Sequence, residues 1–173
     1  TMHLTQAGGG HSPREVKAAA IASVAPAVTE GLAAGLEAAT GRKPVLVGPG
    51  SRLPLKLDVD EPLTVGADRV LNTLAAVELY RRDTIVVDFG TATTFDCITA
   101  DTPPRFIGGA IAPGLVTGAD NLVHRAAKLP ATELSPPARA IGRRTEDCIR
   151  AGVLFGAADA ADGMVRRIKA EWP

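Results

Sequence analysis

The 173-residue sequence predicts a mixed α/β protein. Short runs rich in Val, Ile, Thr and Phe at 84–89, 93–99 and 105–114 are separated only by brief turns, which is typical of consecutive antiparallel strands. Longer stretches before and after them have helical patterns. Hydrophobic residues make up 46% and charged residues 22% of the chain, which argues against disorder. We therefore expect helices packed on a sheet that contains a hairpin, not a simple βαβ array.

The first third of the chain gives weaker signals. Residues 16–24 suit a helix by their alanine content or a buried strand by their bulky residues, and periodicity does not decide between them. Pro26 fits the first turn of a helix that ends near Gly41. Residues 43–48 read as a short buried strand. The Pro-rich, polar residues 49–65 predict a loop that connects two lobes, 1–65 and 66–173.

Three helices are predicted in the rest of the chain. Residues 67–82 carry Val70, Leu74 and Val77 on one face, with Leu71 as a further candidate for that face. Two more helices are expected at 115–129 and 145–171, joined by an extended connection. Thr145 is the predicted N-cap of the last helix, because its hydroxyl can accept a bond from an unpaired amide.

Composition excludes several classes of function. Lys+Arg and Asp+Glu both total 19, so no net charge favours nucleic acid or a membrane surface. Cys97 and Cys148 are too few for a disulfide framework or a four-cysteine metal site, and both read as small buried thiols. The most apolar long stretch, 18–36, would span a bilayer poorly, and the N-terminus lacks the features of a signal peptide. We therefore predict a cytoplasmic protein.

The stretch "VVDFGTATTFD" (86–96) is the first candidate for chemistry. Asp88 ends an apolar strand, and a carboxylate there suits a cation held near phosphate. Gly90 allows backbone amides to approach an anion, and the Thr91 hydroxyl adds a donor. The alternative is a plain hairpin in which Asp88 bonds to the turn amides and the threonines favour strand.

Two further motifs have both a functional and a structural explanation. In "VGADR" (65–69), Asp68 and Arg69 begin a helix behind a glycine, where an anion can bind or a carboxylate can cap the helix. In "IGGAIAPG" (107–114), the glycines indicate close approach of either a ligand or a neighbouring segment.

Taken together, "VGADR", "VVDFGTATTFD", "GGAIAPG", "RAAKLP" and "IGRRT", in this order, resemble the type III pantothenate kinases over residues 16–172. The resemblance implies the actin-like ATPase fold of acetate and sugar kinases, Hsc70 and actin, whose two lobes are ribonuclease H-like. Residues 1–65 would then be the remainder of the N-terminal lobe with its connecting loop. Residues 66–173 would hold a helix and the second lobe. The implied activity is ATP-dependent phosphorylation of pantothenate to 4′-phosphopantothenate, the first step of coenzyme A biosynthesis, by a homodimer.

The resemblance also implies substrate-binding residues. Asp68 would be the catalytic proton acceptor for the pantothenate hydroxyl. Gly66, Ala67 and Arg69 would line the pantothenate pocket with it, and Thr145 would contact the same substrate.

The nucleotide and its cations would lie at the hairpin. Asp88 matches the ligand of a monovalent cation (K⁺ or NH₄⁺), and Thr91 matches an ATP contact. Mg²⁺ and the ATP phosphates would be held by an Asp-x-Gly-Asn-Thr turn that does not occur before Val16, and a later Thr-Gly-Gly segment would follow Pro173. We therefore expect the chain to correspond to the middle of such a kinase, with the activity of this segment alone left open. The alternative is a catalytically inactive paralogue that acts as a regulatory or binding protein.

Overall fold

The structure, a computed structural model, describes residues 13–172 and contains two compact units. Unit 1 comprises Thr1–Leu53 and Asp60–Leu71, and unit 2 comprises Pro54–Val59 and Asn72–Pro173. Both units combine helices with strands, which confirms the predicted α/β class. The division into lobes 1–65 and 66–173 stays a prediction.

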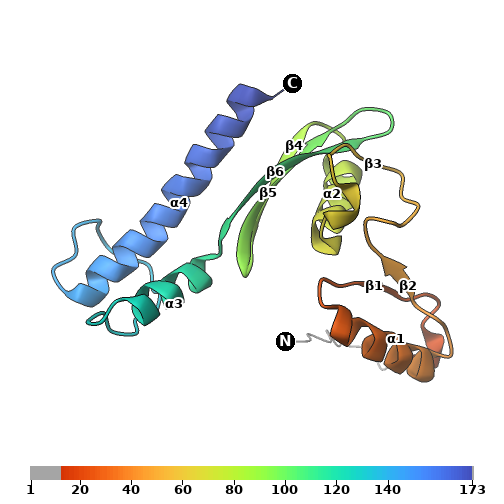
Figure 1. Cartoon of the computed structure of the whole chain (residues 1–173), viewed down its shortest axis with the longest axis horizontal. Coiled ribbons are helices and arrows are strands. Elements are labelled where there is room, and N and C mark those ends of the chain that lie inside the picture. The colour runs from red at the N-terminus through yellow and green to blue at the C-terminus, as the bar shows by residue number, and fades with distance from the viewer. Residues whose placement is uncertain (1–12, 173) are drawn as a thin grey trace. The chain divides into compact units, whose positions relative to one another are not determined.

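Unit 1 contains a parallel pair of short strands, β1 (Ala20–Ala22) and β2 (Val45–Val47), joined through α1 (Pro26–Thr40) (Figure 1). Pro26 lies in the first turn of α1, and Gly41 ends the helix in the left-handed conformation at φ 70°. Both limits of this helix were predicted. Of the helix and the strand that residues 16–24 could form, the structure contains the strand, β1.

The second strand of this pair is less buried than its sequence indicates. Val45 and Leu46 are 63% and 54% exposed, so the predicted strand exists but its predicted burial is wrong within the described residues. A two-stranded sheet covers little of its own surface.

The predicted loop 49–65 contains two short elements, which corrects the prediction. These are β3 (Lys56–Leu57) and the 3₁₀ helix η2 (Pro62–Thr64). β3 pairs in parallel with the first residues of a distant strand, and a two-residue pairing leaves no periodic signal in the sequence.

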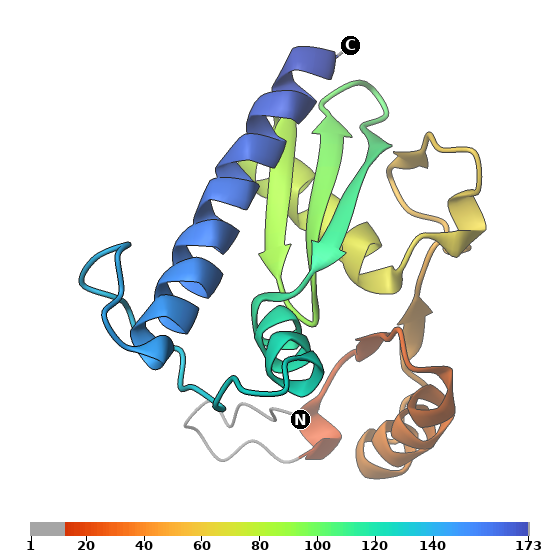
Figure 2. The ribbon, with the colours of Figure 1, turned by 60° about the vertical axis from the view of Figure 1, so that its left-hand side comes forward.

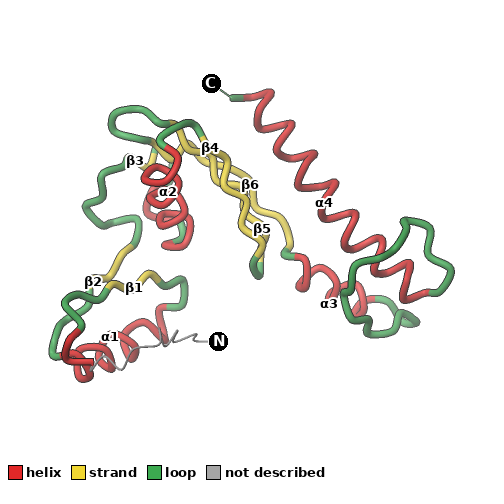
Figure 3. The backbone as a smooth tube through the Cα atoms, turned by 180° about the vertical axis from the view of Figure 1, so that it is seen from behind, coloured by secondary structure: helices red, strands yellow, loops and turns green. Residues whose placement is uncertain are grey.

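Unit 2 is built on a four-stranded sheet of order β3-β6-β5-β4. β4 (Thr84–Phe89), β5 (Ala92–Thr99) and β6 (Arg105–Pro113) are antiparallel neighbours, as predicted, and run side by side in Figures 1 and 3. A register shift interrupts the β5–β6 pairing between Cys97 and Ile98. The best-buried apolar side chains of this sheet are those of Phe95, Ile98 and Phe106, each at most 2% exposed.

Helices cover both faces of the sheet in unit 2. Asn72, in α2 (Ala67–Tyr80), is hydrogen-bonded to Asp96 of β5, whereas Met164 and Ile168 of α4 (Thr145–Glu171) line a cavity together with Cys97. Since neighbouring residues of a strand point to opposite faces, α4 and the unit 2 part of α2 lie on opposite sides of the sheet (Figure 2).

The helix limits agree with the prediction except at two places. α3 (Leu115–Arg125) ends four residues earlier than expected. α4 has the predicted range, but its N-cap is Arg144, which makes no side-chain cap bond, so the prediction that Thr145 caps the helix is wrong. The first helical turn instead closes on the Arg144 carbonyl, which accepts a bond from the Cys148 amide at 3.0 Å.

Burial corrects two further expectations. On α2 the buried residues are Ala67, Val70, Thr73 and Ala76, whereas the predicted Leu74 and Val77 are only half-buried and Leu71 is exposed. Cys97 is buried as predicted, but Cys148 is exposed.

Candidate functional site

The hairpin turn between β4 and β5 is tied to the start of α3. The Gly114 amide and the Thr117 hydroxyl both donate to the Thr91 carbonyl, at 3.1 and 2.9 Å. The Gly90 amide closes the turn on the Ala92 carbonyl at 3.0 Å. The backbone of Thr91 is therefore held both by the start of α3 and by the hydrogen bond within the turn.

Gly114 is the residue that permits this contact. A Cβ atom on Gly114 would lie 2.6 Å from the carbonyl carbon of Thr91 and closer still to the carbonyl oxygens of Gly90 and Thr91. Ordinary contact begins at about 3.4 Å, so no side chain fits here without movement of the turn. Close approach of the chain to itself thus explains the last glycine of "IGGAIAPG", and this approach positions the turn that carries Thr91.

Asp88 does not form the bonds of a plain hairpin. Its Oδ2 accepts a hydrogen bond from the Asn72 side-chain amide at 3.4 Å. The same Asn72 nitrogen lies 3.4 Å from Oδ2 of Asp96, whose side chain is fully buried in β5. One amide therefore joins an exposed carboxylate at the end of β4 to a buried carboxylate in β5.

The Thr94 hydroxyl belongs to the same region of the sheet. Thr94 is paired directly with Asp88 across the strands, and Thr94 and Asp96 are two residues apart, so the three side chains share one face. The Thr94 Oγ1 atom is buried and has no hydrogen-bond partner among the described residues. We call Asn72, Asp88, Thr94 and Asp96 the hairpin cluster.

Sequence reasoning missed Asn72, Thr94 and Asp96 as members of a site. A signal for Asp96 was present, because an acidic residue in the middle of an apolar strand is almost never buried without partners. No comparable signal existed for Asn72, which contacts Asp96 from 24 positions away in the sequence.

The residues of "VGADR" lie at the start of α2, in unit 1. Ala67 is buried, and Asp68 is exposed in the first helical turn, where its carboxylate accepts a bond from the Arg69 amide at 2.8 Å. A Cβ atom on Gly66 would collide with Oδ1 of Asp68. The carboxylate therefore bonds to a backbone amide of its own helical turn, and its exposure leaves it accessible to a ligand.

The structure brings the predicted residues together in three places. Gly66, Ala67, Asp68 and Arg69 share the start of α2, Asp88 and Thr91 share the hairpin, and Thr145 is the exposed first residue of α4. Asp68 belongs to unit 1 and Asp88 to unit 2.

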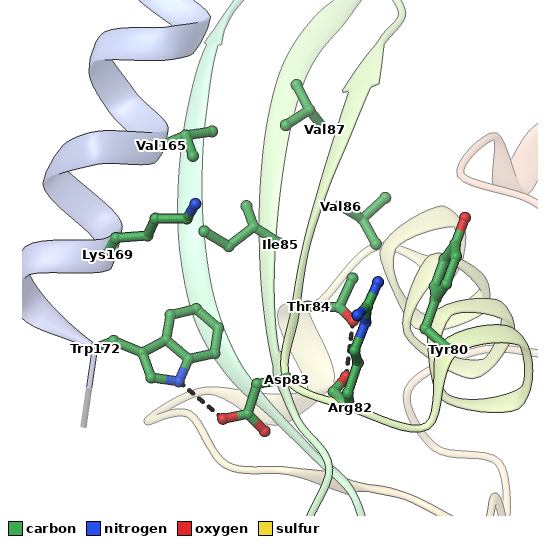
Figure 4. Close-up of a pocket in the computed structure, with 10 residues that line it drawn as sticks. All are labelled: Tyr80, Arg82, Asp83, Thr84, Ile85, Val86, Val87, Val165, Lys169 and Trp172. Carbon is green, nitrogen blue, oxygen red and sulfur yellow. Dashed lines mark hydrogen bonds between the residues drawn. The ribbon is translucent and has the colours of Figure 1, made fainter.

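A cavity of about 840 Å³ lies elsewhere in unit 2, between β4 and the end of α4 (Figure 4). Its walls include Ile85, Val87 and Val165, and the Trp172 indole donates to Asp83 at 3.2 Å. The cavity contains none of the predicted site residues.

Three side chains near the start of β6, those of Asp58, Asp101 and Arg105, have shifted pKa values. These shifts reflect ion pairs that stabilise the fold. Hydrogen bonds from Lys56 and from Arg105 lower the pKa of Asp58, and bonds from Thr99 and Arg105 lower the pKa of Asp101. The Arg105 guanidinium donates to Asp101 at 2.6 Å and to Asp58 at 2.7 Å, which raises its own pKa. This network connects the residue after β3 to β6.

Residues 13–172 contain neither a clustered metal-ligand set nor a membrane-spanning helix. No group of three or more His, Cys, Asp and Glu side chains in this part of the chain is arranged to hold a metal ion. None of its helices combines the length and the apolarity needed to cross a membrane.

The family model and the most similar curated proteins all point to the same family. The family model described as "Type III pantothenate kinase" matches residues 2–167. Type III pantothenate kinases of Moorella thermoacetica and Thermomicrobium roseum are 42% and 41% identical to the chain, over 91% and 98% of its length. The alignments cover 61% and 65% of those two proteins, so the chain spans less than two-thirds of the relatives it matches.

A solved structure shares the fold. The crystal structure of a protein from Campylobacter jejuni, described as a Baf family transcriptional activator, matches with a TM-score of 0.56 and 22% identity. The match covers 87% of this chain and 66% of that one.

Proposed function

Because the chain belongs to the type III pantothenate kinase family, we propose that its protein transfers the γ-phosphoryl group of ATP to pantothenate. The product is 4′-phosphopantothenate, and the reaction begins coenzyme A biosynthesis. The family match over residues 2–167 carries this proposal, and the residues that the resemblance assigns to both substrates lie within that range. We further propose the actin-like ATPase fold, a homodimer and a cytoplasmic location, all from the family resemblance.

Asp68 is the proposed proton acceptor. The pantothenate hydroxyl oxygen attacks the γ-phosphorus, its proton passes to the Asp68 carboxylate, and the bond to the β-phosphate oxygen breaks with its electron pair leaving on ADP. A carboxylate is a weak base towards an alcohol, so most of the rate enhancement comes from positioning and from neutralised charge. The exposed position of Asp68 in the first turn of α2 is compatible with this role.

Residues around Asp68 complete the proposed pantothenate site. Arg69 suits the pantothenate carboxylate or the charge that develops in the transition state, since guanidinium forms strong bonds to both. Gly66 leaves room directly beside the Asp68 carboxylate. Ala67 and Thr145 are assigned to the same pocket through the family motifs.

Thr91 is the proposed ATP contact. Its backbone is fixed by Gly114 and Thr117, so a phosphate that meets the turn encounters a preorganised surface.

Asp88 is the proposed ligand of a monovalent cation, K⁺ or NH₄⁺. The unpartnered Thr94 hydroxyl on the same sheet face fits this role, because such a cation is bound by oxygen atoms. When bound, the cation would neutralise phosphate charge beside Thr91. We assign no residue of this chain to Mg²⁺, which usually binds substrate phosphates together with only one or two carboxylates.

No observation on the described residues favours the inactive paralogue. The acidic, basic and hydroxyl residues that the family motifs require are present at Asp68, Arg69, Asp88, Thr91 and Thr145.

The test is an assay of phosphopantothenate formation by the protein expressed from its complete gene, with ATP, Mg²⁺ and K⁺. Asp68→Asn should lower kcat by at least roughly 100-fold, the usual contribution of a positioned base. Asp60→Asn is the matched control, because Asp60 is also exposed in unit 1 and has no assigned role. An inactive wild-type protein, or equal activity of the two variants, would refute the proposed function.

A further inference from the structure

The hairpin cluster contains an arrangement that the proposed reaction does not by itself explain. Two carboxylates of neighbouring strands, Asp88 and Asp96, share one amide nitrogen, that of Asn72, at 3.4 Å from each. Asp96 is fully buried, whereas Asp88 is exposed. All three residues belong to unit 2.

The chemistry of the amide makes it suited to this place. A side-chain NH₂ group has two hydrogens, so it can donate one to each carboxylate. It also bridges two carboxyl groups that lie on neighbouring strands and on the same face of the sheet. Because Asp96 is buried in β5, the amide links the exposed Asp88 side chain to the interior of the sheet.

We propose that Asn72 is a positioning residue, which orients the Asp88 carboxylate towards the monovalent cation and so sets the affinity of that position. The proposal rests on the proposed function, from which the cation at Asp88 is taken. Asn72 itself touches neither the cation nor the substrates. Its effect passes through Asp88.

The Thr94 hydroxyl gives the proposal an independent support. A buried hydroxyl without a hydrogen-bond partner lowers the stability of the folded protein. Such a group is explained where a bound ion or ligand supplies the missing partner. Thr94 lies directly across from Asp88 in the strand register, so an ion held by Asp88 has a second oxygen within the same face.

The first experiment measures cation binding without substrates. The thermal midpoint of the complete protein is followed as KCl replaces choline chloride at constant ionic strength. Wild-type protein should be stabilised by K⁺. Asn72→Leu, which keeps the shape but removes the amide, should raise the K⁺ concentration for half-maximal stabilisation about tenfold, the effect of one lost hydrogen bond to a charged group.

The control and the second variant separate positioning from simple packing. Asn121→Leu is matched, because Asn121 is exposed on α3 in the same unit and should leave the K⁺ response unchanged. Thr94→Val should also weaken the K⁺ response, yet without K⁺ it should not lower the midpoint, since it removes an unpartnered buried hydroxyl. If Asn72→Leu does not fold, Asn72→Ser and Thr94→Val provide the comparison.

The possible results lead to different conclusions. An unchanged half-stabilising K⁺ concentration in the Asn72 variants, with only a lower midpoint, would show a structural role and overturn the proposal. Absence of any K⁺-specific stabilisation of the wild-type protein would overturn it as well. Neither result would refute the kinase assignment, which the Asp68→Asn assay tests separately.

Discussion

Replacement of Gly114 by alanine should damage the protein through the hairpin turn. The new Cβ atom would lie 2.6 Å from the Thr91 carbonyl carbon, whereas ordinary contact begins at about 3.4 Å. The turn must therefore move by more than about 0.8 Å, because the carbonyl oxygens of Gly90 and Thr91 would lie closer still, and these atoms belong to hydrogen-bonded backbone. Overpacking of this kind costs roughly 1–3 kcal/mol.

The expected consequence is a lower thermal midpoint. For a domain of this size, 1 kcal/mol corresponds to roughly 2–4 °C, so Gly114→Ala, at a cost of roughly 1–3 kcal/mol, should lower the midpoint by roughly 2–12 °C. The assay is thermal unfolding followed by circular dichroism, with urea unfolding as the second measurement. Because the turn carries Thr91, the KM for ATP should rise as well.

Gly118→Ala is the matched control on the same helix. A Cβ atom on Gly118 would meet nothing within 4 Å, and alanine is preferred to glycine in a helix interior by about 1 kcal/mol. This variant should therefore be slightly more stable than wild type. If Gly114→Ala is as stable as Gly118→Ala, the argument that the turn is held by close backbone contact is wrong.

Two further substitutions test other parts of the molecule. Gly66→Ala should lower kcat with little loss of stability, because the new methyl group displaces the short, exposed Asp68 side chain and no backbone; unchanged kinetics would contradict the placement. Arg105→Ala should lower the thermal midpoint at neutral pH, because the lowered pKa values of Asp58 and Asp101 stabilise the folded state above about pH 4. That difference from wild type should shrink as the pH falls below the ordinary value of 3.8 and through the lowered pKa values, so a difference that does not shrink on acidification would contradict the argument.

The parts of the fold that the sequence predicted correctly are those determined by neighbouring residues. The β4–β5 hairpin follows from two apolar runs around Gly90, and α1 follows from Pro26 at its start and Gly41 at its end. Each signal lies within a few residues of the structure it determines.

The errors concern contacts between distant segments. β3 forms only because residues near Lys56 meet the start of β6, and no local pattern announces a two-residue strand. Thr145 has the right side chain for a cap, but the connection places Arg144 in that position. Asn72 and Asp96 were missed for the same reason, since only the packing of α2 on the sheet brings them together.

The position of β4 at the end of the sheet has a practical consequence. Ile85, Val86 and Val87 make it apolar on both faces, a composition usual in the middle of a sheet, yet no described residue pairs with its outer side. The unpaired amides and carbonyls along such a strand can recruit the same strand of another molecule. When produced alone, residues 13–172 should therefore self-associate at high concentration.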